Sequence, residues 1–368
     1  MPDMIDESIK KENRGYILDF PVLRDGDVIL ISGQKAHSLV IRSVTKSHYS
    51  HAMIFLEGTI FEATLDGSVF TRVPNRFYVE SQSDMKVLRF NEPLSHKDVQ
   101  AIVGFARDNV MTSYSITEAI RSSKKNKPTT KREMGQFCSR YVAECYFAAG
   151  LRIAKNIYYC TPADLEKAPE FSEVINAVRL GTSEEILHAS SGELHPKHQK
   201  ATVLWVKGAK KILQAAGYKA QTISQINQAI IDLRSADIDK RIAKLIRASG
   251  YLDNVHEDRK ANPYRYDASI FADFLRGGQI EIGVEIAKDR PLFKLHLNNH
   301  RINRINIVNT NDLYKVFRLH QQVYQSNLSM IGERMQTIIE ASAMSGLCSH
   351  LVEEAVQMNS EIQKELSR

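Results

Sequence analysis

The most constraining feature of the sequence is a predicted β-hairpin centred on Glu57-Gly58. Two runs rich in apolar and β-branched residues, 52–56 and 59–64, flank this dipeptide, which is a plausible two-residue turn. Such a turn fixes the strand register, because it places Leu56 opposite Thr59. Every other side chain of the two strands is thereby assigned to one face of the sheet.

The predicted register brings a histidine and a carboxylate together. Met53 falls opposite Glu62 and His51 opposite Thr64, so His51 and Glu62 share one face as diagonal neighbours. A carboxylate in that position can orient an imidazole ring. A three-residue loop would instead place Glu62 on the opposite face from His51, so this pairing requires a turn of even length.

A second stretch, residues 135–144, places a cysteine at the start of a predicted helix. Cys138 follows a polar, glycine-containing loop and precedes apolar residues at helical spacing, which end at Gly150. In a first helical turn, unpaired amides and the helix dipole favour a thiolate, and a neighbouring imidazolium favours it further. The same amides can hold the oxyanion of an acyl-transfer intermediate. Cys138 is therefore the candidate nucleophile.

Each of these residues also has a purely structural interpretation. A free cysteine is most often a small buried hydrophobe, as we expect for Cys145, which lies two helical turns after Cys138 in an apolar stripe. His51 is compatible with a satisfied core histidine. Glu62 would be ordinary on an exposed face but would need a partner on a buried one. The helix start and the hairpin together favour the catalytic interpretation.

Five short motifs follow one another between about Leu23 and Val174. In chain order they are Gly26-Asp27-Val28-Ile29-Leu30, Ser50-His51, Glu62, Phe137-Cys138-Ser139 and Thr161-Pro162-Ala163-Asp164-Leu165. This order resembles that of the circularly permuted NlpC-type papain-like cysteine hydrolases, in particular the YiiX/YebB-like group, which is related to lecithin:retinol acyltransferase-like proteins. In that family the histidine strand precedes the cysteine helix, the reverse of papain, and a third polar residue lies on the next strand. The resemblance implies that Cys138, His51 and Glu62 are the catalytic residues.

Other polar residues lie beside the two stretches. Gln136 and Tyr49 are candidates to help form the oxyanion hole. A basic loop at residues 124–132 can draw an acidic substrate or a membrane surface towards the site, although a merely solvated loop is the simpler interpretation. His37 and His48, in the segment before the hairpin, are expected to be solvated.

The length of 368 residues indicates two domains. Residues 1–20 form a polar N-terminal lead in this interpretation. Residues 21–180 contain the strand signals and form an α+β domain, an antiparallel sheet with packed helices, for which the resemblance implies a permuted papain-like fold. Residues 181–368 contain successive amphipathic helical runs and form an α-helical accessory domain.

The predicted strands are expected to form a meander. Residues 28–32 lead to the hairpin, the turn Asp66-Gly67 returns the chain into residues 69–73, and residues 85–90 follow as a last strand. A helix capped by Ser95 is expected to cover the sheet. In the second half, the pattern predicts separate helices, two of them at 313–324 and 330–343, whereas residues 298–311 are compatible with a strand or a loop.

Composition and cysteine spacing argue against a nucleic-acid-binding protein and against a protein with a structural metal. A net charge of +6 is modest for this length, and no basic reading helix or zinc finger indicates nucleic-acid binding. The four cysteines form no CxxC pair and no Cys/His cluster at zinc spacing, which indicates a reducing compartment and neither a structural metal nor a cofactor. His188, His195 and His198 are compatible with a metal site, but exposed linker histidines are more common.

The N-terminus is acidic and lacks the basic and apolar regions of a signal peptide, and no apolar segment approaches the length of a membrane span. We therefore expect a cytoplasmic protein, or one exported without a cleaved signal.

The residues together predict a cysteine hydrolase that acts by acyl transfer. An amide bond of a peptide is the first expectation for its substrate, because the NlpC-type resemblance implies that activity. The alternatives are a lipid acyl hydrolase or acyltransferase, and a non-enzymatic protein in which the helical domain binds a protein partner. No motif specifies the acyl group, the leaving group or the oligomeric state.

Overall fold

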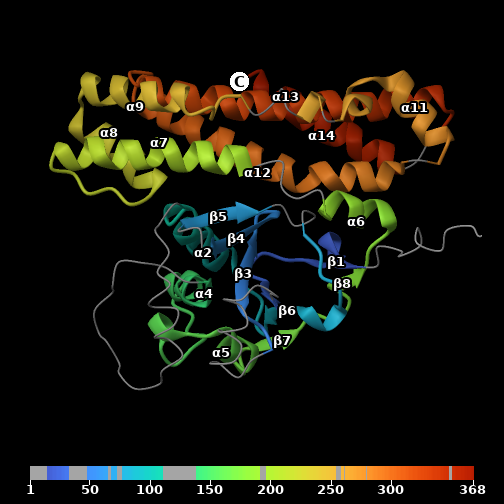
Figure 1. The fold of residues 1–368 in the computed structure, drawn as a ribbon, viewed down its shortest axis with the longest axis horizontal. Coiled ribbons are helices and arrows are strands. Elements are labelled where there is room, and N and C mark those ends of the chain that lie inside the picture. Colours follow the sequence, from blue (N-terminus) through green and yellow to red (C-terminus); the bar gives the residue numbers. More distant parts are fainter. Residues whose placement is uncertain are drawn as a thin grey trace, which may run out of the picture.

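A computed structural model describes residues 15–32, 48–64, 68–72, 77–110, 138–190, 196–253, 258–260, 262–278, 280–347 and 350–368. Figure 1 shows a sheet-bearing part, built from the first half of the chain, and a layer of long helices that lies across one end of the sheet. The protein has the α+β fold that the sequence predicts.

The central element is an antiparallel sheet of six described strands in the order β5-β4-β3-β2-β6-β7. The strands are β2 (Val28–Ile31), β3 (His51–Leu56), β4 (Thr59–Thr64), β5 (Ser68–Arg72), β6 (Met85–Phe90) and β7 (Phe171–Glu173).

The expected meander is correct only for β2 to β5. Strand β6 does not follow β5 but pairs with the other edge of β2, where Val28 lies opposite Leu88. The physical reason is the burial of β2: Val28, Ile29 and Leu30 are all fully buried, and a strand that is apolar on both faces is typical of a sheet interior. The turn predicted at Asp66-Gly67 lies outside the described residues.

Helices α2 (His96–Asp108) and α4 (Cys138–Ala148) cover one face of the sheet. Helix α2 begins at the predicted cap, where Ser95 and Asp98 form a capping box. Tyr141 joins the two helices, because its hydroxyl donates to the carbonyl of Ala106 at 2.9 Å. This face and the two helices share one hydrophobic core. Helix α5 (Pro162–Glu166) and the short 3-10 helices η2 (Phe20–Val22), η3 (Gln82–Asp84) and η4 (Ile157–Tyr159) complete this part.

The other face of the sheet is covered by a two-stranded ribbon. Strand β1 (Tyr16–Leu18) pairs antiparallel with β8 (Val178–Leu180), and Leu18 packs in a core with Ile29 and Met53. Residues 16–18 thus belong to the sheet-bearing part, which corrects the polar lead expected to extend to residue 20. Residues 1–14 lie outside the described ranges.

Helix α6 (Ser183–Ser190) lies beside the β1–β8 ribbon, between it and the helical layer (Figure 1). The layer itself is built from seven helices that the structure describes. They are α7 (Pro196–Ala215), α8 (Ile223–Leu233), α9 (Ala236–Ala248), α11 (Ala268–Arg276), α12 (Ile282–Asn309), α13 (Lys315–Met344) and α14 (His350–Leu366), with a 3-10 helix, η5, at Pro263–Tyr266. The layer has two hydrophobic clusters of its own, one around Trp205 and one around Phe271. Among the described residues, none of the helices is both long and apolar enough to cross a membrane.

Two predictions about the helical layer are corrected by the structure. The runs 313–324 and 330–343 belong to a single helix, α13. Residues 298–309 continue helix α12 and are neither a strand nor a loop. Asparagine is a poor helix former, but the Asn303 side chain is buried against α13, where Nδ2 donates to the carbonyl of Phe317 at 2.9 Å and to Oε1 of Gln321 at 2.8 Å. Tertiary contacts therefore override the local preference.

Polar contacts join the helical layer to the sheet-bearing part. Ser224 donates to Asp108 at 2.8 Å, between α8 and the end of α2. Arg107, also in α2, donates to Asn299 of α12 at 3.1 Å. The division of the chain into separable domains near residue 180 remains a prediction.

Candidate active site

The hairpin that carries His51 and Glu62 has the predicted two-residue turn. Glu57 and Gly58 have φ angles of 50° and 78°, which is the left-handed conformation that both central residues of a type I′ turn require. The register pairs Leu56 with Thr59 and Ile54 with Phe61. The even-length turn inferred from the sequence is therefore confirmed.

The turn places His51 and Glu62 in contact. Nε2 of His51 lies 2.7 Å from Oε2 of Glu62. The Glu62 residue is only 4% exposed, whereas 22% of the His51 side chain is exposed. A carboxylate buried in an otherwise apolar strand needs a hydrogen-bonding partner, and the imidazole of His51 supplies one.

Cys138 begins helix α4, whose first nine residues are all buried. The side chain of His51 and the backbone N–H groups of Ala52 and Ser139 lie close enough to the thiol to lower its pKa by charge and hydrogen bonding. The start of the helix is anchored by Ser139, whose hydroxyl donates to the carbonyl of Cys160 at 2.7 Å. Because Nε2 of His51 is engaged by Glu62, Nδ1 is the ring nitrogen left for the thiol.

The electrostatics of this cluster favour a charged pair. Burial alone would lower the pKa of His51, but the thiolate of Cys138 and the carboxylate of Glu62 raise it to about 10. Burial alone would raise the pKa of Cys138, but the charge and hydrogen bond of His51 and the two backbone amides lower it below the ordinary thiol value. The arrangement therefore favours a thiolate–imidazolium pair.

The other described cysteines lack this environment. Cys145 lies in the core, as expected from its apolar stripe, and Cys160 is also buried. Burial raises the pKa of both thiols well above the usual value, and no cation lowers it among the causes that act on either group. Cys348 lies outside the described residues. Among the described thiols, only Cys138 combines a lowered pKa with a histidine partner.

The other polar residues considered in the sequence analysis either lie outside the described residues or have contacts that do not define a catalytic role. Tyr49 is 5% exposed, and its ring lies beneath the ammonium group of Lys86, 5.7 Å from the centroid; its role in an oxyanion hole stays a prediction. His48 is half exposed and its Nε2 lies 3.1 Å from Oδ1 of Asp84, a contact that the sequence did not indicate. Gln136, His37, the loop 124–132 and His195 lie outside the described residues, as does the side chain of His198.

The sequence reasoning missed the groups that hold the start of α4. The amide of Ala52 comes from the strand that carries His51 and so links the strand to the thiol. Two residues after Cys138, the buried Arg140 pairs with Glu144 at 3.4 Å, and its guanidinium lies over the ring of Tyr158. The only sequence signal was the adjacency of these polar residues to Cys138.

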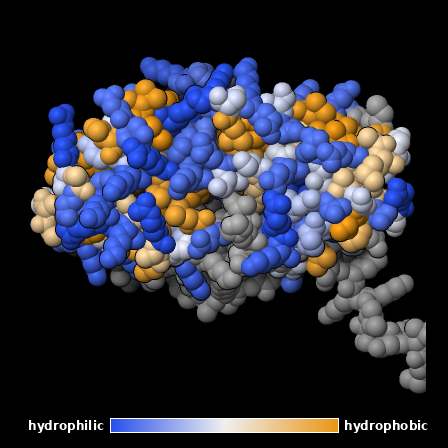
Figure 2. Space-filling model, turned by 90° about the horizontal axis from the view of Figure 1, so that it is seen from above, coloured by the Kyte–Doolittle hydropathy of each residue, from blue (hydrophilic) through white to orange (hydrophobic). Residues whose placement is uncertain are grey.

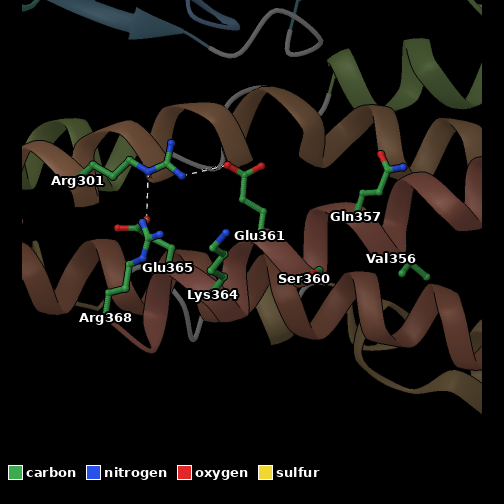
Figure 3. Close-up of a pocket in the computed structure, with 8 residues that line it drawn as sticks. All are labelled: Arg301, Val356, Gln357, Ser360, Glu361, Lys364, Glu365 and Arg368. Atoms are coloured by element: carbon green, nitrogen blue, oxygen red, sulfur yellow. Dashed lines mark hydrogen bonds and ion pairs between the residues drawn. The ribbon is translucent and has the colours of Figure 1, made fainter.

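Two surface depressions lie away from this cluster. One, of about 550 Å³, lies between the Glu57-Gly58 turn and helix α12, where it is bordered by Phe20, Arg290 and Lys294. The other, of about 470 Å³, lies between α12 and α14 at the C-terminal end of the chain. Figure 3 shows that Arg301 points across the second depression towards Glu361 and Glu365, with which it forms ion pairs. Neither depression is lined by Cys138, His51 or Glu62.

Among the described residues, no group of three or more His, Cys, Asp or Glu side chains is placed to hold a metal ion. No protein-family model and no curated protein matches the sequence. Among solved structures, the chain is similar to the crystal structure of the metalloprotein YiiX from Escherichia coli O157:H7. The two share 19% sequence identity over 42% of this chain and 97% of that one, with a TM-score of 0.31. A similarity of this size carries no argument about function.

Proposed function

We propose that the protein is a cysteine hydrolase that works by acyl transfer through Cys138. The observation that carries this proposal is the chain of contacts from Glu62 through His51 to a thiol at the start of a buried helix. A nucleophile, a base and a group that orients the base are the parts that such a reaction needs. The lowered pKa of Cys138 supplies the reactive thiolate.

In the proposed reaction, the Cys138 thiolate attacks the carbonyl carbon of the substrate. When the sulfur loses its negative charge in this step, the amide of Ser139, which donates to the thiolate, becomes available to stabilise the negative oxygen that forms. The tetrahedral intermediate then expels the leaving group, which takes a proton from the His51 imidazolium. The remaining thioester is attacked by water, whose proton returns to the now neutral His51, and the acid product and the free thiolate are released.

The substrate proposed first is an amide bond of a peptide, and the competing substrate class is a lipid ester. Two acylating probes, one with a peptide recognition group and one with a lipid tail, separate these classes, with the Cys138→Ser variant as the control. We expect the peptide probe to form an adduct that mass spectrometry locates on Cys138. Faster labelling by the lipid probe would assign the substrate to lipids. If neither probe acylates Cys138 while iodoacetamide still does, the hydrolase proposal is wrong.

A first prediction concerns Glu62. Glu62→Gln should preserve the fold and keep part of the activity, because glutamine still accepts a hydrogen bond from the ring but no longer stabilises its charge. His51→Ala removes the base itself, and kcat/KM should fall by about 10²- to 10⁴-fold. Both rates are measured with the better acyl probe, and circular dichroism reports the fold.

The matched control is Glu173→Gln, on strand β7, where 58% of the Glu173 side chain is exposed. That change should leave the rate unaltered. An unchanged rate for Glu62→Gln would remove Glu62 from the proposed catalytic residues.

A further inference from the structure

The positive charge of the protein is concentrated in one segment of the helical layer. Residues 200–253 contain ten of the 49 lysines and arginines but only four of the 43 acidic residues. The rest of the chain therefore has 39 of each, and this segment accounts for the whole net charge of +6. One of its four acidic residues, Asp239, is buried and accepts from the backbone N–H groups of Lys315 and Val316 at the start of α13. It does not offset the charge at the surface.

On α7, three exposed lysines lie on one stripe. Lys200, Lys207 and Lys211 recur at spacings of seven and four residues, which is one face of a helix. Leu204 lies on the same stripe and is 62% exposed. Trp205 points elsewhere, since its ring packs against His320 of α13. The stripe therefore faces away from α13.

Helix α9 has a similar exposed stripe, formed by Lys240, Lys244 and Arg247. Its buried side faces α7 and α13: Leu245 lies next to Gly208 of α7. Both stripes are exposed, and the two helices that carry them pack against each other. We call the six basic side chains and Leu204 the basic face.

The lysines and arginine of the basic face make no ion pair with a described carboxylate. The neighbouring Arg241 does, at 3.5 Å from Asp237, and both of those side chains are more than half exposed. Like charges gathered on one surface repel one another and favour an anionic partner. Figure 2 shows that hydrophilic surface predominates at the end of the layer that carries α8 and α9, with small apolar patches within it.

We propose that the basic face docks the protein on an anionic lipid surface. Basic side chains attract acidic headgroups, and an exposed leucine among them can enter the boundary between headgroups and acyl chains. The exposure of Leu204 favours a membrane over a nucleic acid as the partner. An aliphatic side chain gains free energy when it is buried among acyl chains, whereas it gains none beside a phosphate backbone. This inference does not depend on the proposed hydrolase activity.

The test is sedimentation of the full-length protein with vesicles of phosphatidylcholine, with or without phosphatidylglycerol. Binding should require phosphatidylglycerol and weaken at high salt. The combined change Lys207→Glu, Lys211→Glu and Lys244→Glu should reduce the affinity by about 100-fold or more, because each basic residue near an anionic membrane contributes about fivefold. Leu204→Gln should weaken binding by roughly tenfold.

The matched control variant has the same change of net charge at three lysines outside the basic face. Lys97→Glu, Lys260→Glu and Lys364→Glu alter three exposed lysines outside the basic face and should leave vesicle binding nearly unchanged. The proposal is overturned if the wild type does not bind anionic vesicles, or if this control loses as much affinity as the basic-face variant. It is also overturned if a single-stranded oligonucleotide binds more tightly than the vesicles and Leu204→Gln weakens neither interaction.

Discussion

Alkylation of Cys138 by iodoacetamide should persist below neutral pH, where the other thiols of the folded protein stop reacting. An ordinary thiol with a pKa of about 8.5 is only ~0.3% thiolate at about pH 6. The imidazolium of His51 and the amides of Ala52 and Ser139 lower the pKa of Cys138, so its thiolate should survive to lower pH. Site-resolved mass spectrometry across a pH series measures the effect.

His51→Ala provides the informative comparison. Without the imidazolium, burial should raise the pKa of Cys138, and its labelling profile should move to higher pH. Cys145 and Cys160 serve as internal controls, because burial raises the pKa of both. If either of them labels before Cys138 in acid, or if His51→Ala leaves the Cys138 profile in place, the thiolate–imidazolium pair does not exist.

A second large effect is expected from a buried charge network in the helical layer. Arg334 on α13 donates to Asp289 of α12 at 2.5 Å and also to Asp258. The other oxygen of Asp289 accepts from Arg265 at 2.7 Å. Arg334 is 2% exposed and Asp289 is fully buried. Arg334→Met would leave two buried carboxylates short of a partner and should reduce the free energy of unfolding by about 3–5 kcal/mol.

Arg318→Met is the matched control for this prediction. Arg318 lies on the same helix and pairs with Asp312 at 2.7 Å, but more than half of each side chain is exposed. An exposed ion pair of this kind contributes little to stability, so the variant should unfold at nearly the wild-type denaturant concentration. Urea or guanidinium titrations compare the two variants. Equal losses would mean that the buried network contributes no more than a surface pair.

The parts of the site that were predictable from the sequence are those set by local rules. The turn at Glu57-Gly58 needs left-handed backbone at both residues. Glycine at the second position indicates such a turn in the sequence, because glycine adopts this conformation without strain. Its even length then places Glu62 beside His51 without further information. Cys138 at a helix start was equally local, because the apolar spacing begins immediately after it.

The features that were missed depend on contacts between distant residues. The place of β6 beside β2 follows from burial of β2 on both faces, which no local pattern of β6 reveals. Residues 298–309 are helical because Asn303 finds partners on α13. The charge network around Asp289 assembles from three segments of the chain. In each case the deciding partner lies far away in sequence, so propensity and periodicity could not identify it.

The pairing of β1 with β8 has a consequence for how this chain can be cut and joined. Tyr16 lies opposite Leu180, and residues paired in this way have Cα atoms about 5 Å apart. The polypeptide therefore enters and leaves the sheet-bearing part at a single point. A segment with adjacent ends can be spliced into a surface loop of a host protein, or its ends can be sealed by a short linker and reopened elsewhere, with little distortion of either partner. The hairpin and the cysteine helix lie wholly between those two ends, so one transferred segment would contain all the proposed catalytic residues.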